Sequence, residues 1–173
     1  MSFNETYYKY YPELIKYGRQ LCASKIDIDD LVQETFLKYH IELSKNFVIE
    51  NTRAWLYKVL LNLAITHNNR KSLYANKIKH HKRPDIEIGI DEEFAKKERR
   101  ELVLQHLDKL PEKEKNLLLL YHNGLKYKEI AQVLDINPNS VGKLLVRSIT
   151  KLKQLLKTDY HELFKYSYHS GIY

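Results

Sequence analysis

The side chains best suited to chemistry in this sequence lie in its last third, and they are hydrogen-bonding and cationic groups. Asn139, Ser140, Lys143 and Arg147 recur at helical spacing. Amide, hydroxyl, ammonium and guanidinium groups are the ones that bind phosphates and the edges of DNA bases. If these residues share one face of a helix, that face is predicted to enter a DNA groove.

The residues before this set predict a helix-turn-helix that would hold it. Segment 127–134 has helical apolar spacing, Ala131 is small where two helices would cross, and Asp135 occupies a turn that needs a left-handed residue. Asn137 can cap a second helix that starts at Pro138. An ordinary helical hairpin has the same apolar spacing. The small alanine, the cap–proline pair and the basic outer face favour DNA binding over that alternative.

A second polar and basic segment follows an apolar helix in the first half of the chain. We expect that helix to start at Asn51 and to carry an apolar stripe from Trp55 to Leu63. From Thr66 to Ser72 the stripe gives way to polar and basic residues. Such a helix can pack on a core with one part and present charge to phosphates with the other. A solvated helix end is the alternative.

No group of residues typical of a catalytic or metal site accompanies these segments. The sequence has no nucleophile–base pair and no Gly-rich phosphate loop. Asp27, Asp29 and Asp30 could hold the metal of a nucleic-acid enzyme, but a helix start with Asp27 as N-cap explains them more simply. The histidines at 80, 81 and 161 lack ligand partners, and a single cysteine excludes an intrachain disulfide. We therefore predict a protein that is not an enzyme and has no cofactor or metal.

The elements that position the polar segments are predicted to be helices throughout. Among 173 residues there are only 5 Gly and 4 Pro, too few for the many tight turns of an all-β protein. Apolar residues at helical spacing mark further helices in five segments: residues 5–21, 27–43, 51–71, 91–109 and 111–123. The fold class is therefore predicted to be all-α.

Charge is distributed in blocks that indicate two domains. The net charge is +6 over residues 1–83, −3 over 84–110 and +4 over 111–173. The acidic block opens with a segment that contains Pro and Gly and has no helical spacing of apolar residues, which is typical of a linker. We predict two small helical domains with a linker and an aromatic tail: 1–82, 83–93, 94–157 and 158–173. A loop within one domain is the alternative.

Membrane insertion is not expected. The first residues show no secretory signal, and the longest apolar runs, such as Leu117–Tyr121, fall far short of the roughly 20 residues that span a bilayer. We expect a soluble, cytoplasmic protein. Its excess of basic charge favours an anionic partner.

Three motifs, in this order, resemble those of the sigma-70 family of bacterial RNA polymerase sigma factors, specifically the small extracytoplasmic-function (ECF) type, over most of residues 5–156. The run Asp-Ile-Asp-Asp-Leu-Val-Gln-Glu-Thr-Phe-Leu-Lys-Tyr at 27–39 resembles a helix of region 2. Residues 51–59 and 61–65 resemble the helix that melts promoter DNA and reads the −10 element. Residues 107–115, with the helix-turn-helix, resemble region 4, which binds the −35 element.

The resemblance implies residues for contact with core RNA polymerase and with the −10 element. Those for the polymerase are Asp30, Leu31, Gln33, Glu34 and Phe36. Leu31 and Phe36 fit the buried stripe of their helix equally well, and core packing is also favoured for Trp55. Those for −10 DNA are Asn46, Phe47, Asn51, Asn62, Thr66, His67, Asn69, Arg70 and Lys71.

The residues implied for the −35 element are Lys126, Asn139, Ser140, Lys143 and Arg147. The chain departs from the family pattern at Thr66, usually Asp, at Lys126, usually a Ser cap, and at Asp135, usually the turn Gly. The promoter sequence is therefore not predicted.

The predicted function is transcription initiation: the chain binds core RNA polymerase and directs it to promoters by reading −10 and −35 DNA. The family also implies an anti-sigma factor as partner. The alternative is a dimeric helix-turn-helix regulator that acts without joining polymerase. In the tail, five aromatic residues between Tyr160 and Tyr173 either form an interaction surface or pack on the second domain.

Overall fold

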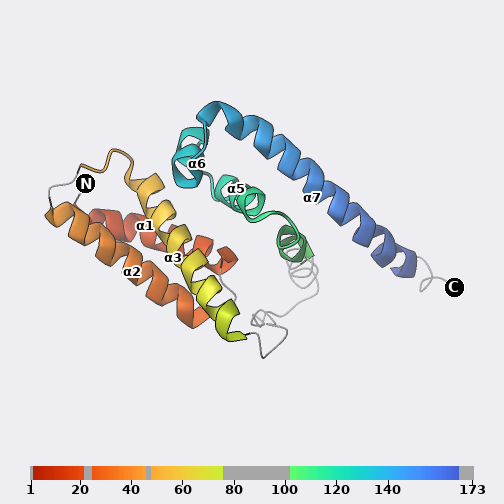
Figure 1. Ribbon diagram of the computed structural model, residues 1–173, viewed down its shortest axis with the longest axis horizontal. Coiled ribbons are helices and arrows are strands. Elements are labelled where there is room, and N and C mark those ends of the chain that lie inside the picture. The colour runs from red at the N-terminus through yellow and green to blue at the C-terminus, as the bar shows by residue number, and fades with distance from the viewer. Residues whose placement is uncertain (1, 22–24, 46–47, 76–101, 168–173) are drawn as a thin grey trace. The chain divides into compact units, whose positions relative to one another are not determined.

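The computed structural model describes residues 2–21, 25–45, 48–75 and 102–167. The helices are α1 (Phe3–Leu21), α2 (Lys25–Ser44), α3 (Thr52–Ala75), α5 (Glu112–His122), α6 (Tyr127–Leu134) and α7 (Pro138–Ser167) (Figure 1). Residues 102–107 are helical as well. These described ranges contain no strand, so the all-α prediction is confirmed.

Helices α1, α2 and α3 pack against one another around an apolar core. Each helix supplies fully buried side chains to it, among them Leu14, Tyr17, Val32, Leu56 and Leu60. All of these except Tyr17 belong to the helical stripes that predicted the three helices. Burial of these stripes holds α3 in place, and α3 carries most of the predicted −10 residues.

Helices α1 and α2 approach each other closely at Gly18. A Cβ added there would lie 2.9 Å from Cγ2 of Ile28, nearer than real side chains come. Glycine at this position therefore allows the two helices to cross closely, and a larger residue would push Ile28 aside.

Of the two N-cap residues predicted for α2 and α3, the structure confirms the one for α3 and contradicts the one for α2. Helix α3 starts at Thr52, and Oδ1 of Asn51 accepts a hydrogen bond from the Ala54 N–H at 3.0 Å, as expected for an N-cap. Helix α2 starts at Lys25, so the prediction that Asp27 is its N-cap was wrong. The main chain is already helical at Asp27, and the residue lies within the first turn.

The chain forms two compact units. The first joins Met1–Ile86 with Leu119–Pro138, because α6 packs against α3. The second comprises Glu87–Leu118 and Asn139–Tyr173. These units group residues by contact, whereas the domains predicted above follow the sequence. Those domain boundaries stay a prediction, and the linker 83–93 lies outside the described residues.

The second unit contains its own ion pairs and buried residues. Lys115 pairs with Asp108 at 2.6 Å, and Lys151 pairs with Glu114 at 2.5 Å. Buried apolar side chains come from α5 and from α7, including Leu117, Val141 and Leu145. Helix α7 continues to Ser167, so the first ten residues of the predicted tail extend this helix. The side chains of the tail lie outside the described residues.

Candidate nucleic-acid interface

A row of polar side chains follows one face of α3. Asn62, Thr66 and Asn69 are exposed and lie three or four residues apart, so they share that face. The Thr66 hydroxyl donates to the Asn62 carbonyl at 2.9 Å. His67 is half-buried beside them. Arg70 and Lys71 continue α3, but their side chains lie outside the described part, as do Asn46 and Phe47 as whole residues.

Lys58 belongs to the same face, one turn before Asn62, and the sequence analysis missed it. Its Nζ lies 2.6 Å from Oδ1 of Asp135, the residue in the turn after α6. The spacing of four residues between Lys58 and Asn62 was the signal that could have identified it. With Lys58, the polar face of α3 gains a cation.

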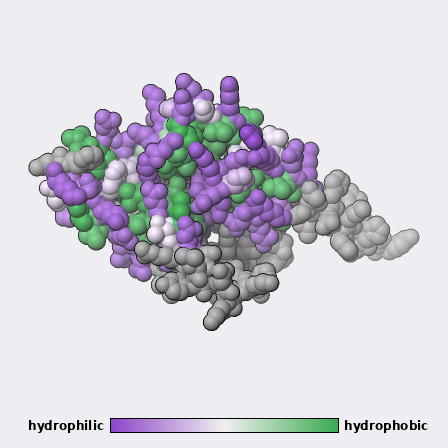
Figure 2. All heavy atoms as spheres, in the orientation of Figure 1, coloured by the Kyte–Doolittle hydropathy of each residue, from purple (hydrophilic) through white to green (hydrophobic). Residues whose placement is uncertain are grey.

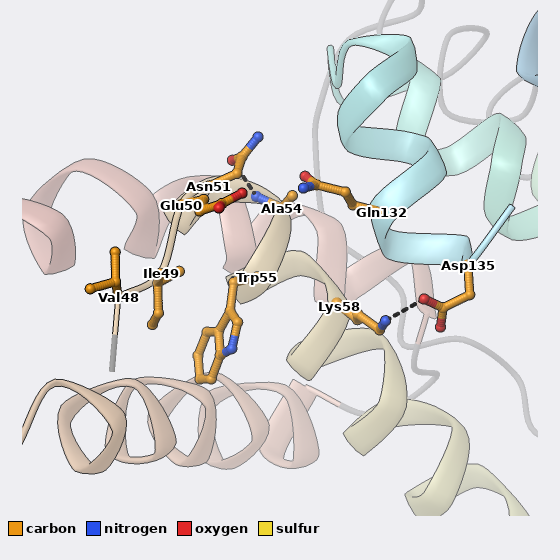
Figure 3. A pocket seen from close by; sticks show the side chains of 9 residues that line it. All are labelled: Val48, Ile49, Glu50, Asn51, Ala54, Trp55, Lys58, Gln132 and Asp135. Carbon is orange, nitrogen blue, oxygen red and sulfur yellow. Dashed lines mark hydrogen bonds and ion pairs between the residues drawn. The ribbon is translucent and has the colours of Figure 1, made fainter. Parts of the chain in front are cut away.

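An open pocket of about 440 Å³ lies at the N-terminal end of this face (Figure 3). Trp55 is half-buried in it, and its ring points from α3 toward Tyr39 of α2, with 5.8 Å between ring centroids. Trp55 therefore both packs on the bundle and contributes to the pocket. The residues that line it are Val48, Ile49, Glu50, Asn51, Ala54, Trp55, Lys58, Gln132 and Asp135.

Arg53, in the first turn of α3, joins α1 to the turn between α5 and α6. Its Nε and Nη2 donate to Oε2 of Glu13 at 3.1 and 2.9 Å. The same guanidinium donates to the carbonyl oxygens of Asn123, at 3.0 Å, and Gly124, at 2.9 Å. The Glu129 carboxylate lies 3.7 Å away. Arg53 thus binds the free carbonyls at the end of α5, which a cation satisfies well.

The protonation states of Arg53 and the neighbouring Tyr57 do not change near neutral pH. Partial burial disfavours the charge on Arg53, but hydrogen bonds and the charge of Glu13 outweigh it and raise the pKa of the guanidinium. Burial, followed by the Glu13 charge, raises the pKa of the Tyr57 hydroxyl well above its usual range. That hydroxyl, 3.3 Å from Oε2 of Glu13, donates to the carboxylate. Arg53 therefore stays charged and the Tyr57 hydroxyl stays protonated at physiological pH.

The outer face of α2 is the predicted polymerase-binding surface. Asp30, Gln33 and Glu34 are exposed on it. Leu31 and Phe36 are buried, 7% and 3% exposed, so these two residues belong to the core, the alternative left open by the sequence. On the face shown in Figure 2, hydrophilic residues predominate and hydrophobic ones lie in small groups.

Two apolar residues on α2 were missed. Leu37 is 59% and Ile41 43% exposed, and they follow Asp30, Gln33 and Glu34 on the outer face. Both are apolar residues outside the buried stripe of their helix, and that position was the available signal. Their exposure turns an acidic face into an acidic and apolar one.

The turn between α6 and α7 has the geometry predicted for a helix-turn-helix. Asp135 is left-handed, with φ 49° and ψ 54°, and the Ile136 N–H donates to the Ala131 carbonyl at 3.0 Å. Ala131 is buried, and α7 starts at Pro138. Lys126, ahead of α6, is exposed, and its N–H donates to the Glu129 carboxylate at 2.7 Å.

Helix α7 exposes three of its four predicted residues. Asn139, Lys143 and Arg147 are exposed, and Ser140 is half-buried. Their spacing of four residues places Asn139, Lys143 and Arg147 along one face. Val146, next to Arg147, is 67% exposed and was not among the predicted residues.

The described residues contain neither a candidate metal site nor a candidate membrane span. No group of three or more His, Cys, Asp or Glu side chains in them could hold a metal ion. None of the described helices is both long and apolar enough to cross a bilayer.

The chain matches two family models and two curated relatives from Bacillus subtilis (strain 168). Sigma-70 region 2 matches residues 6–73, and Sigma-70, region 4 matches residues 100–152. RNA polymerase sigma factor SigZ is 26% identical over 165 residues, covering 93% of this chain and 90% of that protein. ECF RNA polymerase sigma factor SigM is 23% identical over 168 residues, covering 90% of this chain and 95% of that protein.

Solved structures share the fold. CnrH, in complex with the cytosolic domain of CnrY, aligns with TM-score 0.66 at 23% identity, over 91% of this chain and 88% of that one. RpoE from Bartonella quintana, in complex with the anti-sigma factor NepR, aligns with TM-score 0.65 at 19% identity, over 91% and 98%. Because regions 2 and 4 follow each other in this order over most of the chain, the protein belongs to the sigma-70 family of RNA polymerase sigma factors, ECF type, which are promoter-specific initiation factors that bind the polymerase.

Proposed function

We propose that this sigma factor uses three separate surfaces to bring core RNA polymerase to a promoter. The outer face of α2 binds the polymerase, the polar face of α3 reads the −10 element, and α7 binds the −35 element. The observation that carries the proposal is the exposed row Asn62, Thr66 and Asn69, which continues beyond the apolar part of α3. Amide and hydroxyl groups such as these can donate hydrogen bonds to base edges and accept them.

The −10 element would be read as single-stranded DNA. Asn side chains can donate to and accept from the edge of an unpaired base, and Lys58 supplies a cation for its phosphate. A base extruded from the stack needs a pocket with a ring to stack on and polar groups for its edge. The pocket beside Trp55, with Glu50 and Asn51 in its wall, has these features.

The −35 element would be read in the major groove by α7. Lys143 and Arg147 supply cations for phosphate or guanine, and Asn139 suits adenine. Val146 offers a methyl-bearing surface of the kind that contacts the thymine methyl group. This face therefore combines direct base contacts with phosphate contacts.

The partner of α2 would be a polymerase surface that is apolar at its centre and basic around it. Leu37 and Ile41 supply apolar area, and Asp30 and Glu34 supply negative charge. Leu31 and Phe36 support this face from beneath. Mutation of either would act through the fold of the bundle.

An anti-sigma factor is a further proposed partner. The neighbour RpoE is bound to the anti-sigma factor NepR. A protein of this kind would control the chain by covering its polymerase or DNA surfaces in the cytoplasm. In this scheme the polymerase performs the catalysis, and the chain itself performs none. A dimeric regulator is less favoured, because two sigma regions are matched in tandem.

In vitro transcription with core RNA polymerase and a library of promoter fragments tests the function. We expect initiation from a discrete subset of promoters only when this protein is added. Transcription that stays unselective, together with failure to copurify with core polymerase, would overturn the proposal. A dimeric regulator would instead bind duplex sites alone, with half-site spacing set by its symmetry.

Matched variants test the surfaces separately. Arg147→Ala should weaken binding of the −35 site and lower the salt slope by about 1, whereas Lys153→Ala, also exposed on α7, should change it less. Leu37→Glu should reduce copurification with polymerase, whereas Tyr8→Glu on α1 introduces the same charge at a residue outside the proposed surface. If the two variants of a pair had equal effects, the surface that the pair tests would be wrongly assigned.

A further inference from the structure

The contact between α3 and α6 joins the proposed −10 surface to the helix-turn-helix. On α3 it comprises Arg53 and Lys58. On the other side it comprises the end of α5 and α6 with its turn, through Asn123, Gly124, Glu129 and Asp135. We propose that this contact is an internal competitor for DNA: the Asp135 carboxylate of the chain's own helix-turn-helix occupies Lys58, the cation of the polar face of α3 that a phosphate would bind. The proposal rests on the −10 role of α3.

The charges across the contact are complementary. Lys58 and Asp135 approach to 2.6 Å, and Arg53 and Glu129 to 3.7 Å. A carboxylate and a phosphate are both anionic oxygen acceptors, and Arg and Lys bind either of them. The Asp135 carboxylate neutralises much of the charge on Lys58 and repels a phosphate that approaches it. A DNA phosphate therefore competes with Asp135 for Lys58, and promoter binding favours the state in which this ion pair is open.

The same contact supplies one wall of the pocket next to the −10 face. Gln132 and Asp135 come from α6 and its turn, and they lie across the pocket from Ala54 and Lys58 of α3 (Figure 3). Ile49 and Asn51 line it from the loop before α3. A base that entered this pocket would meet α6, so α6 and DNA compete for both the cation and the space.

Asp135, in the turn after α6, supplies the carboxylate that competes with DNA for Lys58. The left-handed conformation of Asp135 is cheapest for glycine, which has no side chain to offer. Aspartate tolerates the conformation and adds a carboxylate, and that carboxylate is the one that Lys58 binds. Aspartate at this turn thus has a partner on α3 that glycine could not bind.

Part of the contact between α3 and α6 consists of weak, exposed interactions. The charged side chains across it include the Lys58–Asp135 pair, in which the side chains are 37% and 76% exposed. Exposed ion pairs are weak and are screened by salt. Gln20 of α1 adds a hydrogen bond from Asn123 at 2.6 Å. These hydrogen bonds and ion pairs can hold α6 against α3 in the free protein and can still be displaced by a polyanion such as DNA.

Zero-length cross-linking with a carbodiimide tests the contact in the full chain. This reagent joins an amine to a carboxylate that touches it, so it should link Lys58 to Asp135, detected as a cross-linked peptide by mass spectrometry. Lys115 and Asp108, also 2.6 Å apart, provide an internal control for the same chemistry. A free protein that yields the control cross-link without the Lys58–Asp135 cross-link would overturn the proposal.

Competition is tested by adding single-stranded DNA of random sequence, about 20 nucleotides long, at low salt. We expect bound DNA to reduce the Lys58–Asp135 cross-link severalfold and to leave the Lys115–Asp108 cross-link unchanged. Bound DNA that leaves both cross-links unchanged would overturn the competition, although the protein would still bind DNA.

Asp135→Asn and Asp108→Asn each remove one carboxylate, and asparagine keeps the left-handed turn. Asp135→Asn should increase the affinity for this DNA about two- to fivefold more than Asp108→Asn does, the range that loss of one exposed ion pair allows. Equal affinities would overturn the proposal. If no form bound DNA, the −10 role and the competition would both fail, whereas the cross-link in the free protein would still report the contact.

Discussion

Helix α3 is held on two sides by different kinds of interaction. Its inner side packs on α1 and α2 through fully buried apolar residues such as Leu56 and Leu60. Its outer side meets α5 and α6 through Arg53 and Lys58, which bind carbonyl oxygens and carboxylates. The inner contact is apolar and buried, whereas the outer contact also includes ion pairs, of which Lys58–Asp135 is partly exposed.

The difference indicates which part of the structure is permanent. Apolar burial contributes about 25 cal/mol per Å² and is insensitive to the salt that screens exposed charges. An exposed ion pair contributes about 0–1 kcal/mol and competes with any other anion. We infer that the three-helix bundle is the fixed platform and that α6 is bound to it reversibly.

The largest effect is expected from a cavity in the platform. Leu60→Ala should lower the free energy of unfolding by about 2–5 kcal/mol, because Leu60 is fully buried. Denaturant unfolding followed by circular dichroism measures it. Leu37→Ala, at an exposed position on α2, is the control and should cost less than about 0.5 kcal/mol. Similar losses in both variants would contradict the view that the inner contact dominates stability.

A smaller effect is expected where α1 and α2 cross. Gly18→Ala improves helix propensity, but the new Cβ would lie 2.9 Å from Ile28, so we expect a net loss of about 1–3 kcal/mol in unfolding free energy. The same change in an Ile28→Ala background removes the colliding methyl group and should cost less. If the two losses were equal, the close crossing would not be the reason for the glycine.

The sequence was sufficient wherever a local rule decides the structure. Asn51 caps α3 because a side-chain amide can reach the N–H three residues ahead. Asp135 is left-handed and α7 starts at Pro138 because turn and first-turn preferences act within a few residues. The apolar stripe placed the buried face of α2 for the same reason, whereas on α1 it missed the buried Tyr10 and Tyr17 and included the exposed Tyr8. Most of the fold was therefore predictable.

The sequence was insufficient where the partner is distant along the chain. Lys58 and Asp135 are 77 residues apart, and Arg53 and Gly124 are 71 apart, so no periodicity connects them. Leu31 could be assigned to the core or to a surface until α1 and α3 were seen packed against α2. Asp27 shows that even a local rule fails when another residue starts the helix first.

A local effect is expected from the outer contact. Arg53→Lys keeps the charge but loses the fork that binds Glu13 and two carbonyls at once, at a cost of about 1–2 kcal/mol to the α3–α6 contact. Hydrogen exchange should become faster at Leu125 and Ile130 and stay unchanged at Leu60. Equal acceleration at all three amides would show that the outer contact is part of the platform after all.

The smallest effect is expected at the exposed start of α1, where the platform depends on a polar interaction. The Ser2 N–H donates to the Glu5 carboxylate at 2.8 Å, and this bond, followed by one with the Ser2 hydroxyl, lowers the pKa of Glu5. A carboxyl with a lowered pKa stabilises the fold at pH values above its ordinary pKa, and that stabilisation is lost as the pH falls through the lowered value.

Glu5→Gln keeps an acceptor that does not titrate, so between about pH 5 and pH 3 its stability should fall less steeply than that of the unaltered protein. Thermal melting of both proteins across this range measures the difference, in which the other carboxyl groups cancel. If the two curves stayed parallel, the bond from Ser2 would not form in solution, and the platform would be held by apolar packing at this end as well.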